Sequence, residues 1–208
     1  MEVQRGYDQW AAQYDTDINR TRDLEATAIR STLHDIIFKN CLEIGCGTGK
    51  NTGWLSGRAV SLTAADFSIE MLARAREKVT LSNTRFVQAD INGKWAFGKN
   101  EFDLICFSLV LEHISDLDHV FEQSAIALNK TGHIYIGELH PNKQYAGSKA
   151  RFETEEGTKT LQCFNHHISE FTAAAQRHGF RLTLLNEYFD NDDRTGVPRI
   201  LSLLFQKC

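Results

Sequence analysis

The sequence has few prolines, no closely spaced cysteines and no long apolar run. Its five cysteines are an odd number without a short-spaced pair, so we expect neither a disulfide framework nor a structural zinc site. No apolar stretch approaches the roughly 18 residues of a membrane-spanning helix. The segment Met1–Arg5 lacks the apolar part of a secretory signal. These absences favour a reduced, cytoplasmic compartment and no membrane partner.

An excess of positive charge is also missing. Lysines and arginines number 23 against 27 aspartates and glutamates, which gives a formal net charge of −4, and the basic residues are scattered along the chain. Neutralising nucleic-acid phosphates requires clustered cations, so we expect no nucleic-acid partner. At about 150 residues per domain, the chain fits a single domain over residues 1–208.

Short apolar runs alternate regularly with amphipathic segments between residues 40 and 140. The apolar runs predict strands at residues 41–44, 60–65, 85–88, 102–110 and 133–138. The amphipathic segments predict helices at residues 48–56, 69–79 and 117–128. This alternation is typical of right-handed β-α-β crossovers. It predicts an α/β fold with a doubly wound, Rossmann-like, mostly parallel sheet and helices on both faces.

The last quarter of the chain follows another pattern. A helix at residues 168–178 stops at Gly179, and residues 181–188 and 199–206 predict two strands joined by a polar loop. We expect these two strands to form an antiparallel hairpin that closes one edge of a seven-stranded sheet.

The most specific local signal is a cluster of glycines directly after the first predicted strand. Gly45, Gly47 and Gly49 allow the backbone to approach a ligand closely, at the sheet edge where doubly wound folds bind their ligands. A dinucleotide fingerprint needs glycine or alanine at position 50, which holds Lys50. A nicotinamide cofactor is therefore the less favoured alternative.

Two aspartates end the next two predicted strands. Asp66 is placed to accept hydrogen bonds from both hydroxyls of a ribose. Asp90 is placed to accept from the exocyclic amine of an adenine. Each residue has a simpler explanation as a turn or helix cap, but two such aspartates on consecutive strand ends favour a bound nucleoside.

Together these motifs resemble the class I S-adenosylmethionine-dependent methyltransferases that act on small molecules. The resemblance covers about residues 7–140. It rests on Glu43-x-Gly45-x-Gly47-x-Gly49, Asp66 within residues 65–72, Asp90-Ile91, residues 102–113, and the opening Tyr7 to Asp15. It implies four regions: lid helices over 1–39, a cofactor-binding core over 40–138, a substrate-side insertion over 139–167, and a C-terminal helix and strand pair over 168–208.

The resemblance also implies S-adenosylmethionine as cofactor and a role for each matching residue. The loop with Glu43, Gly45, Cys46, Gly47 and Gly49 would pass beneath the methionine part. Asp66 would hold the ribose, and Phe67 or Met71 would pack near the adenine. The remaining implied contacts are Asp90 and Ile91 at the adenine edge, Ser108 and Leu109 near the sulfonium, and Tyr14 in the lid.

Methyl transfer from a sulfonium is an in-line displacement, for which an acceptor hydroxyl or ammonium must also lose a proton. A base is therefore sought at the carboxyl ends of the fourth and fifth strands. His140 is the first candidate and His113 the second. Each could instead cap or orient a loop. Replacing the true base with alanine should slow turnover about 100-fold or more.

The acceptor is expected to contact the first helix and the segment after the fifth strand. The candidates are Tyr7, Trp10, Glu138, Tyr145, Arg151, His166 and His167. Aromatic residues with one arginine would suit a planar or carboxylate-bearing small molecule, although a surface flap with packed aromatics is an equal alternative. No metal is expected, because the acids at positions 116 and 118 fit the first turn of a helix.

Three other functions fit the sequence less well. A nucleic-acid methyltransferase is expected to carry an Asn/Asp-Pro-Pro-Tyr-like motif where Cys106-Phe107-Ser108-Leu109 stands. A nicotinamide-dependent oxidoreductase is disfavoured by Lys50. A non-catalytic module that binds S-adenosylmethionine would share the cofactor residues but lack an acceptor pocket. The sequence specifies neither the acceptor atom nor the oligomeric state.

Overall fold

A computed structural model describes residues 2–154 and 157–208 and contains a seven-stranded sheet in the order β3-β2-β1-β4-β5-β9-β8. The strands are β1 Asn40–Ile44, β2 Ser61–Asp66, β3 Thr84–Gln88, β4 Phe102–Ser108, β5 Leu128–Leu139, β8 Phe180–Tyr188 and β9 Ile200–Lys207. The first five pair in parallel, whereas β9 runs antiparallel to both β5 and β8. The predicted fold class and the C-terminal antiparallel pair are confirmed.

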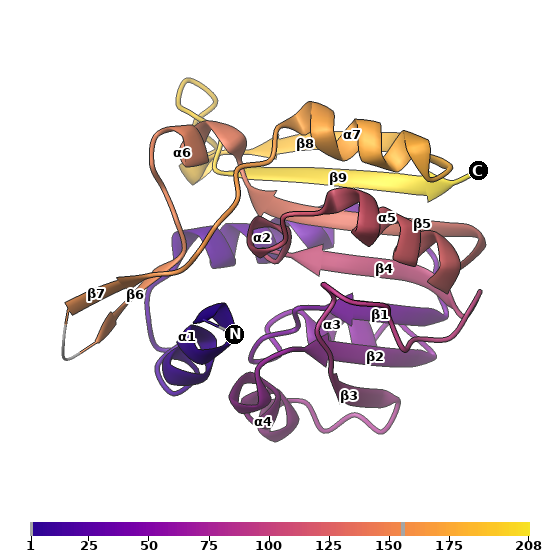
Figure 1. The fold of residues 1–208 in the computed structure, drawn as a ribbon, viewed down its shortest axis with the longest axis horizontal. Helices are drawn as coiled ribbons and strands as arrows, with labels where there is room; N and C mark the ends of the chain where they lie inside the picture. Colours follow the sequence, from indigo (N-terminus) through magenta and orange to yellow (C-terminus); the bar gives the residue numbers. More distant parts are fainter. Residues whose placement is uncertain (1, 155–156) are drawn as a thin grey trace.

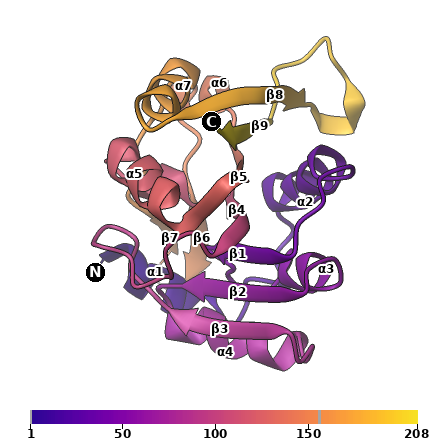
Figure 2. The same cartoon turned by 90° about the vertical axis from the view of Figure 1, so that its right-hand side faces the viewer.

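Helices cover both faces of the sheet (Figure 2). One face carries α2 Arg20–Thr32, α3 Thr52–Ser56 and α4 Ile69–Lys78, and the other carries α5 Leu117–Ala127 and α7 Ile168–Arg177. The larger apolar core lies between the sheet and helices α5 and α7. It includes Phe107, Phe121 and Phe205. The central strands β1, β4 and β9 are mostly buried and apolar because helices cover both faces of the sheet, whereas the edge strands β3 and β8 are largely half-buried or exposed.

Two predicted elements are shorter than expected for a backbone reason. The helix predicted at 48–56 begins only at Thr52, because Gly47 and Gly49 adopt φ values of 52° and 85°, which an α-helix does not accommodate. The strand predicted at 102–110 ends at Ser108, because Leu109 has a φ of 57°. In both cases the regular element gives way to a loop at the carboxyl edge of the sheet.

The helix α5 shows how a local sequence signal sets a boundary. The Asp116 carboxylate accepts the His119 amide at 3.0 Å and caps the N-terminus, which selects Asp116 over Ser115. At the other end the chain passes straight from Ala127 into β5. Gly132 lies inside that strand and does not terminate the helix.

The N-terminal helix α1 Glu2–Trp10 stands apart from the two helical layers. In Figure 1 the arrowheads of β4 and β5 point toward the side of the molecule where α1 lies, and β9 points the other way. The insertion after β5 forms α6 Pro141–Tyr145 and a two-stranded ribbon of β6 Arg151–Thr154 and β7 Gly157–Thr160. The ribbon packs on α1, where the rings of Trp10 and Phe152 stack at 5.2 Å.

None of the helices in the described part of the chain is long and apolar enough to cross a membrane.

Candidate active site

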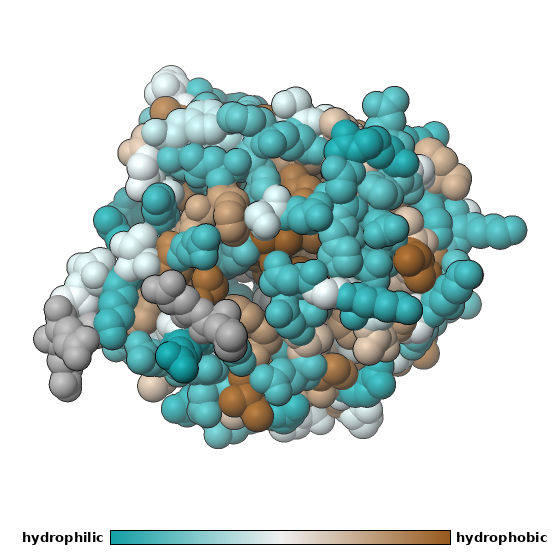
Figure 3. All heavy atoms as spheres, viewed as in Figure 1, coloured by the Kyte–Doolittle hydropathy of each residue, from teal (hydrophilic) through white to brown (hydrophobic). Residues whose placement is uncertain are grey.

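A cleft of about 610 Å³ opens at the carboxyl ends of β1, β2, β3 and β4, beneath α1. Figure 3 shows apolar surface gathered around a hollow near the middle of the face that it displays. The predicted site residues that line the cleft are Tyr7, Tyr14, Gly45, Gly47, Asp66, Phe67, Met71, Asp90, Ile91, Ser108, Leu109 and His113. The fold thus brings together residues from five separate segments.

The glycine loop between β1 and α3 forms the floor of the cleft. Gly45 has a φ of 71°, and a Cβ there would stand 2.0 Å from the Val110 Cγ2, so only glycine fits. A Cβ on Gly47 would meet nothing within 4 Å, so the backbone at this position is open to a ligand. Cys46 and Gly49 do not line the cleft: Cys46 is buried beside Leu72 of α4, and Gly49 lies against Ala75.

Asp66 links the glycine loop to the end of β2. Its Oδ2 accepts the Gly47 amide at 2.8 Å, and its Oδ1 accepts the Ser68 amide at 2.9 Å. Burial raises the pKa of Asp66 to about 6, although these amide hydrogen bonds oppose the shift. A carboxylate oxygen can accept more than one hydrogen bond, so Asp66 retains capacity for ribose hydroxyls.

Asp90 and Ile91 stand at the end of β3 and also line the cleft. Asp90 is exposed, and its Oδ1 accepts the Asn92 amide at 2.9 Å and the Asn92 side chain at 2.8 Å. Asp90 therefore caps a turn, as the simpler explanation expected. It also lines the cleft.

Glu43 lies below the floor of the cleft and does not line it. It is buried in β1, and burial raises its pKa to about 8. Its Oε2 has no hydrogen-bond partner among the described residues.

The helix α1 and the segment after it cover the cleft. The Gln4 side chain donates to the Phe67 carbonyl at 3.0 Å, and Ser68 donates to Asp8 at 2.6 Å. Gln4 was not foreseen from the sequence, although its position one turn before Tyr7 places both on one face of the helix. By contrast, α2 packs against β5 and β9 and belongs to the sheet layers.

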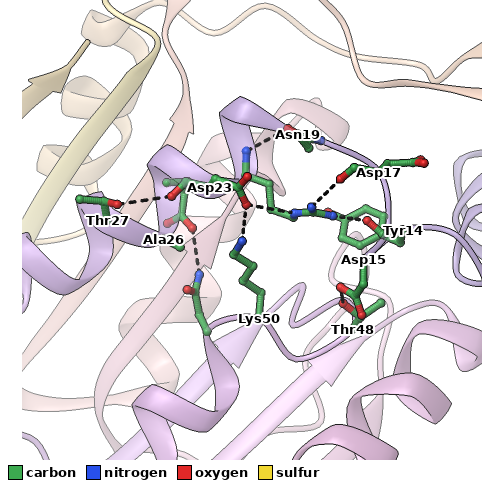
Figure 4. Close-up of polar contacts among 12 residues, drawn as sticks. Tyr14, Asp15, Asp17, Asn19, Asp23, Ala26, Thr27, Thr48 and Lys50 are labelled. Carbon is green, nitrogen blue, oxygen red and sulfur yellow. Dashed lines mark hydrogen bonds and ion pairs between the residues drawn. The ribbon is translucent and has the colours of Figure 1, made fainter. Parts of the chain in front are cut away.

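Polar contacts join this covering segment to the glycine loop. Thr48 donates to Asp15 at 2.6 Å, and Lys78 lies 2.5 Å from the same carboxylate. Figure 4 shows Lys50 turned toward Asp23, with which it forms an ion pair. The side chain at position 50, which argued against a dinucleotide, thus connects the loop to α2.

The opposite end of the cleft is formed by His113, which closes the short helix η1 Leu111–His113 after β4. Its Nδ1 lies 2.8 Å from the Gln162 carbonyl and its Nε2 lies 2.9 Å from the Tyr7 hydroxyl. Because a carbonyl only accepts, Nδ1 carries the hydrogen and Nε2 accepts from Tyr7. Burial raises the pKa of Tyr7, so the phenol keeps its proton.

Glu138 supports this end from below without lining the cleft. Its Oε1 accepts the amides of Val110 and Leu111 at 2.9 and 2.8 Å, which fixes the start of η1. Burial raises the pKa of Glu138 to about 8, and the neighbouring Glu112 adds to the shift.

His140, the first candidate base, lies outside the cleft and is 3% exposed. Its Nε2 is 2.9 Å from a Glu187 oxygen, and its Nδ1 accepts the Asn142 amide at 3.2 Å and so caps α6. Burial lowers its pKa, against the opposing effect of Glu187. The geometry of His140 is that of a residue that orients a loop.

The other predicted acceptor contacts are also placed away from the cleft. Trp10 packs against the ribbon, Arg151 is exposed, and Tyr145 lies 2.5 Å from His167 at the surface. His166 is buried and lies 2.7 Å from the Ile114 carbonyl. The insertion contributes Phe164, an aromatic residue of the segment expected on the substrate side, and Gln162 to the cleft. No pattern in the sequence marks Gln162, which follows the ribbon as irregular chain.

Comparisons with known proteins identify methyltransferases as the relatives of this chain. Residues 42–136 match a methyltransferase domain family. The phosphatidylethanolamine N-methyltransferase of Cereibacter sphaeroides is 30% identical over 64% of this chain and 66% of its own length. A structure of the DhpI–SAH complex superposes with a TM-score of 0.79 and 23% identity, over 99% of this chain and 95% of that one. The chondramide synthase of Chondromyces crocatus is 28% identical over 64% of this chain. The match covers only 4% of the length of that synthase.

Proposed function

We infer the reaction of this chain from its family: it belongs to the class I S-adenosylmethionine-dependent methyltransferases, and its cofactor is S-adenosylmethionine. We propose that it methylates a small-molecule acceptor by in-line displacement. The observation that carries the proposal is one continuous cleft, which runs from the glycine loop and Asp66 to the Tyr7–His113 pair.

The end of the cleft that is formed by the glycine loop and Asp66 fits the cofactor. Gly47 leaves its backbone open, and Asp66 offers buried acceptor oxygens for ribose hydroxyls. The volume of about 610 Å³ lies within the range of roughly 300–1,000 Å³ that small ligands occupy. Asp90 and Ile91 would meet the adenine edge, and Ser108 and Leu109 the methionine side. The bound cofactor supplies a methyl group already activated on a sulfonium.

At the other end, the chain orients the acceptor and removes its proton. His113 Nε2 is an acceptor atom in the cleft, held by Tyr7 on one side and, through Nδ1, by Gln162 on the other. An acceptor group that takes the place of the Tyr7 hydroxyl, or that donates to it, can pass its proton to Nε2. The helix α1 covers this end and excludes water.

The alternatives differ in what the cleft must contain. A dinucleotide-binding loop needs a small residue at position 50 so that its helix can pack closely on the strand, and here Lys50 pairs with Asp23. A module that only binds S-adenosylmethionine needs no cavity beyond the cofactor, whereas this cleft continues to His113, Gln162 and Phe164. The methyltransferase is therefore the better supported function.

Calorimetry with S-adenosylhomocysteine and with NAD tests the cofactor, and methyl transfer over a panel of metabolites tests catalysis. We expect the chain to bind S-adenosylhomocysteine but not NAD, and to transfer a methyl group to at least one small molecule. Binding of S-adenosylhomocysteine without transfer to any member of the panel would instead support a non-catalytic module.

A matched pair of variants tests the base. His113→Ala should slow turnover about 100-fold while leaving the affinity for S-adenosylhomocysteine within about threefold. His140→Ala should leave turnover within about twofold and cost about 1 kcal/mol of stability through the lost cap of α6. The reverse ranking of the two turnover rates would return His140 to the role of base.

A further inference from the structure

The acceptor end of the cleft has no positively charged partner for an anion. Among the described residues that line the cleft there are Asp66, Asp90 and His113 but no lysine or arginine. Arg151, which the sequence offered as a partner for a carboxylate, is exposed on the ribbon. A carboxylate or phosphate group would therefore lose its hydration here without a compensating cation.

A buried carboxyl group stands directly behind the Tyr7–His113 pair. Glu112 is 6% exposed, and its Oε1 lies 3.9 Å from His113 Nε2. Its Oε2 is buried and has no hydrogen-bond partner among the residues that the structure describes. The Cys163 thiol and His113 offset part of the cost of burying this carboxyl group, but Oε2 itself stays unpaired, so a positive charge that arrives with a ligand would be favoured.

The charges around Glu112 come from few groups. Burial raises its pKa, and His113 and the Cys163 thiol oppose that shift. Glu138 adds a second carboxyl group from β5, and Lys149 acts on Cys163 from the insertion. Of these two carboxyl groups, Glu112 is the one that lies beside His113, and Glu138 lies behind it. A cationic ligand would supply the missing positive charge and favour the ionised form of Glu112.

We propose, on the basis of the function proposed above, that the acceptor is an amine and that Glu112 stabilises the positive charge which the amine brings to the Tyr7–His113 pair. Glu112 acts through His113 and is therefore a positioning residue.

The proton and electron balance is simple. One N–H bond of the ammonium breaks, and its proton binds His113 Nε2, where the carboxylate of Glu112 stabilises the imidazolium. The freed nitrogen lone pair then forms the new N–C bond, and the electron pair of the breaking C–S bond stays on the sulfur. No oxidant, reductant or metal is required.

The test uses binding and does not require the natural acceptor. Sinefungin resembles S-adenosylhomocysteine but carries an ammonium group where the cofactor carries its methyl group, so it places a positive nitrogen toward the acceptor end. The measurement is the ratio of the two dissociation constants, S-adenosylhomocysteine over sinefungin, in the full-length chain. We expect Glu112→Gln to lower this ratio at least tenfold while leaving the S-adenosylhomocysteine affinity nearly unchanged.

Two further variants separate charge from structure. Glu112→Asp keeps the charge and should retain most of the wild-type ratio, and Glu122→Gln, an exposed position on α5, should not change it. The ratio should also rise with pH as Glu112 ionises, and Glu112→Gln should lose this dependence.

An equal ratio in wild type and Glu112→Gln, with S-adenosylhomocysteine bound by both, would overturn the amine proposal alone. Failure of wild type to bind S-adenosylhomocysteine would overturn the proposed function instead.

Discussion

The two ends of the cleft are built in different ways. The end proposed for the cofactor consists of loops that follow neighbouring parallel strands, and most of its lining comes from residues 44–47, 65–71, 88–92 and 108–110. The acceptor end joins Tyr7, His113 and Gln162, which are far apart in the sequence. The first end depends on backbone geometry and the second on side chains that meet across segments. Substrate specificity can therefore change at the acceptor end while the cofactor end stays constant.

The helix α1 connects the two ends. Gln4 donates to the Phe67 carbonyl at the end proposed for the cofactor, and Tyr7, one turn later, donates to His113. The same helix is held by the ribbon through Trp10 and Phe152. A shift of this single helix would alter the cofactor contacts and the acceptor contacts together, so variants that separate the two ends are the most informative.

The largest effect is expected at the cofactor end, from Gly45→Ala. The added Cβ would lie 2.0 Å from Val110 Cγ2 at a φ of 71°, so we expect a stability loss of about 2 kcal/mol or more and loss of S-adenosylhomocysteine binding. Gly93→Ala is the control, because a Cβ there meets nothing within 4 Å. Chemical denaturation and calorimetry measure both effects. A Gly45→Ala variant as stable as the control would contradict the assigned loop geometry.

A smaller effect is expected from Asp66→Asn, which keeps the shape of the side chain. Losing a charged acceptor should weaken S-adenosylhomocysteine binding by about 1–3 kcal/mol, or roughly 5- to 150-fold. Since the pKa of Asp66 is raised to about 6, protonation should weaken wild-type binding as the pH falls below 6. The variant should lack that dependence in titrations from pH 5 to 8. A wild-type affinity that is flat over this range would remove the ribose assignment.

The smallest effect is expected from Asp15→Asn, which loosens the cover while leaving both ends of the cleft intact. The Asp15–Lys78 pair is solvent-accessible, so its loss should cost less than about 1 kcal/mol. We expect a faster release of S-adenosylhomocysteine, up to about fivefold, in stopped-flow measurements, and a smaller difference in high salt. Asp35→Asn, an exposed position outside this network, is the control. A larger effect than that of Asp66→Asn would mean that the cover dominates binding.

Much of the fold could be predicted because its signals are local. The alternation of apolar runs and amphipathic segments identified the five parallel strands, the pattern of the last quarter identified β8 and β9, and Gly179 correctly marked the end of α7, where its φ is 79°. One error lies inside a regular element, where Gly132 falls within β5, and two others lie where the backbone leaves regular structure. Periodicity does not report the φ of Leu109 or of Gly47, so the predicted ends of β4 and α3 were wrong.

The two ends of the cleft also differ in how well the sequence predicted their residues. The glycines, Asp66 and Asp90 occur at fixed places relative to strand ends, so their meeting follows from the parallel sheet. His140 had an equally good sequence position, yet its ring is turned toward Glu187 and the start of α6. Which of two histidines reaches the cleft depends on side-chain packing, which strand order does not specify.

The sequence by itself determined the fold class and the cofactor end of this protein, because short-range periodicity and a glycine-rich strand end encode them locally. Only the tertiary structure decided the acceptor end. Tyr7, Glu112, His113 and Gln162 come together there through the packing of α1 and the insertion over the sheet. Contacts between segments this distant depend on the whole folded chain, so no local pattern records them.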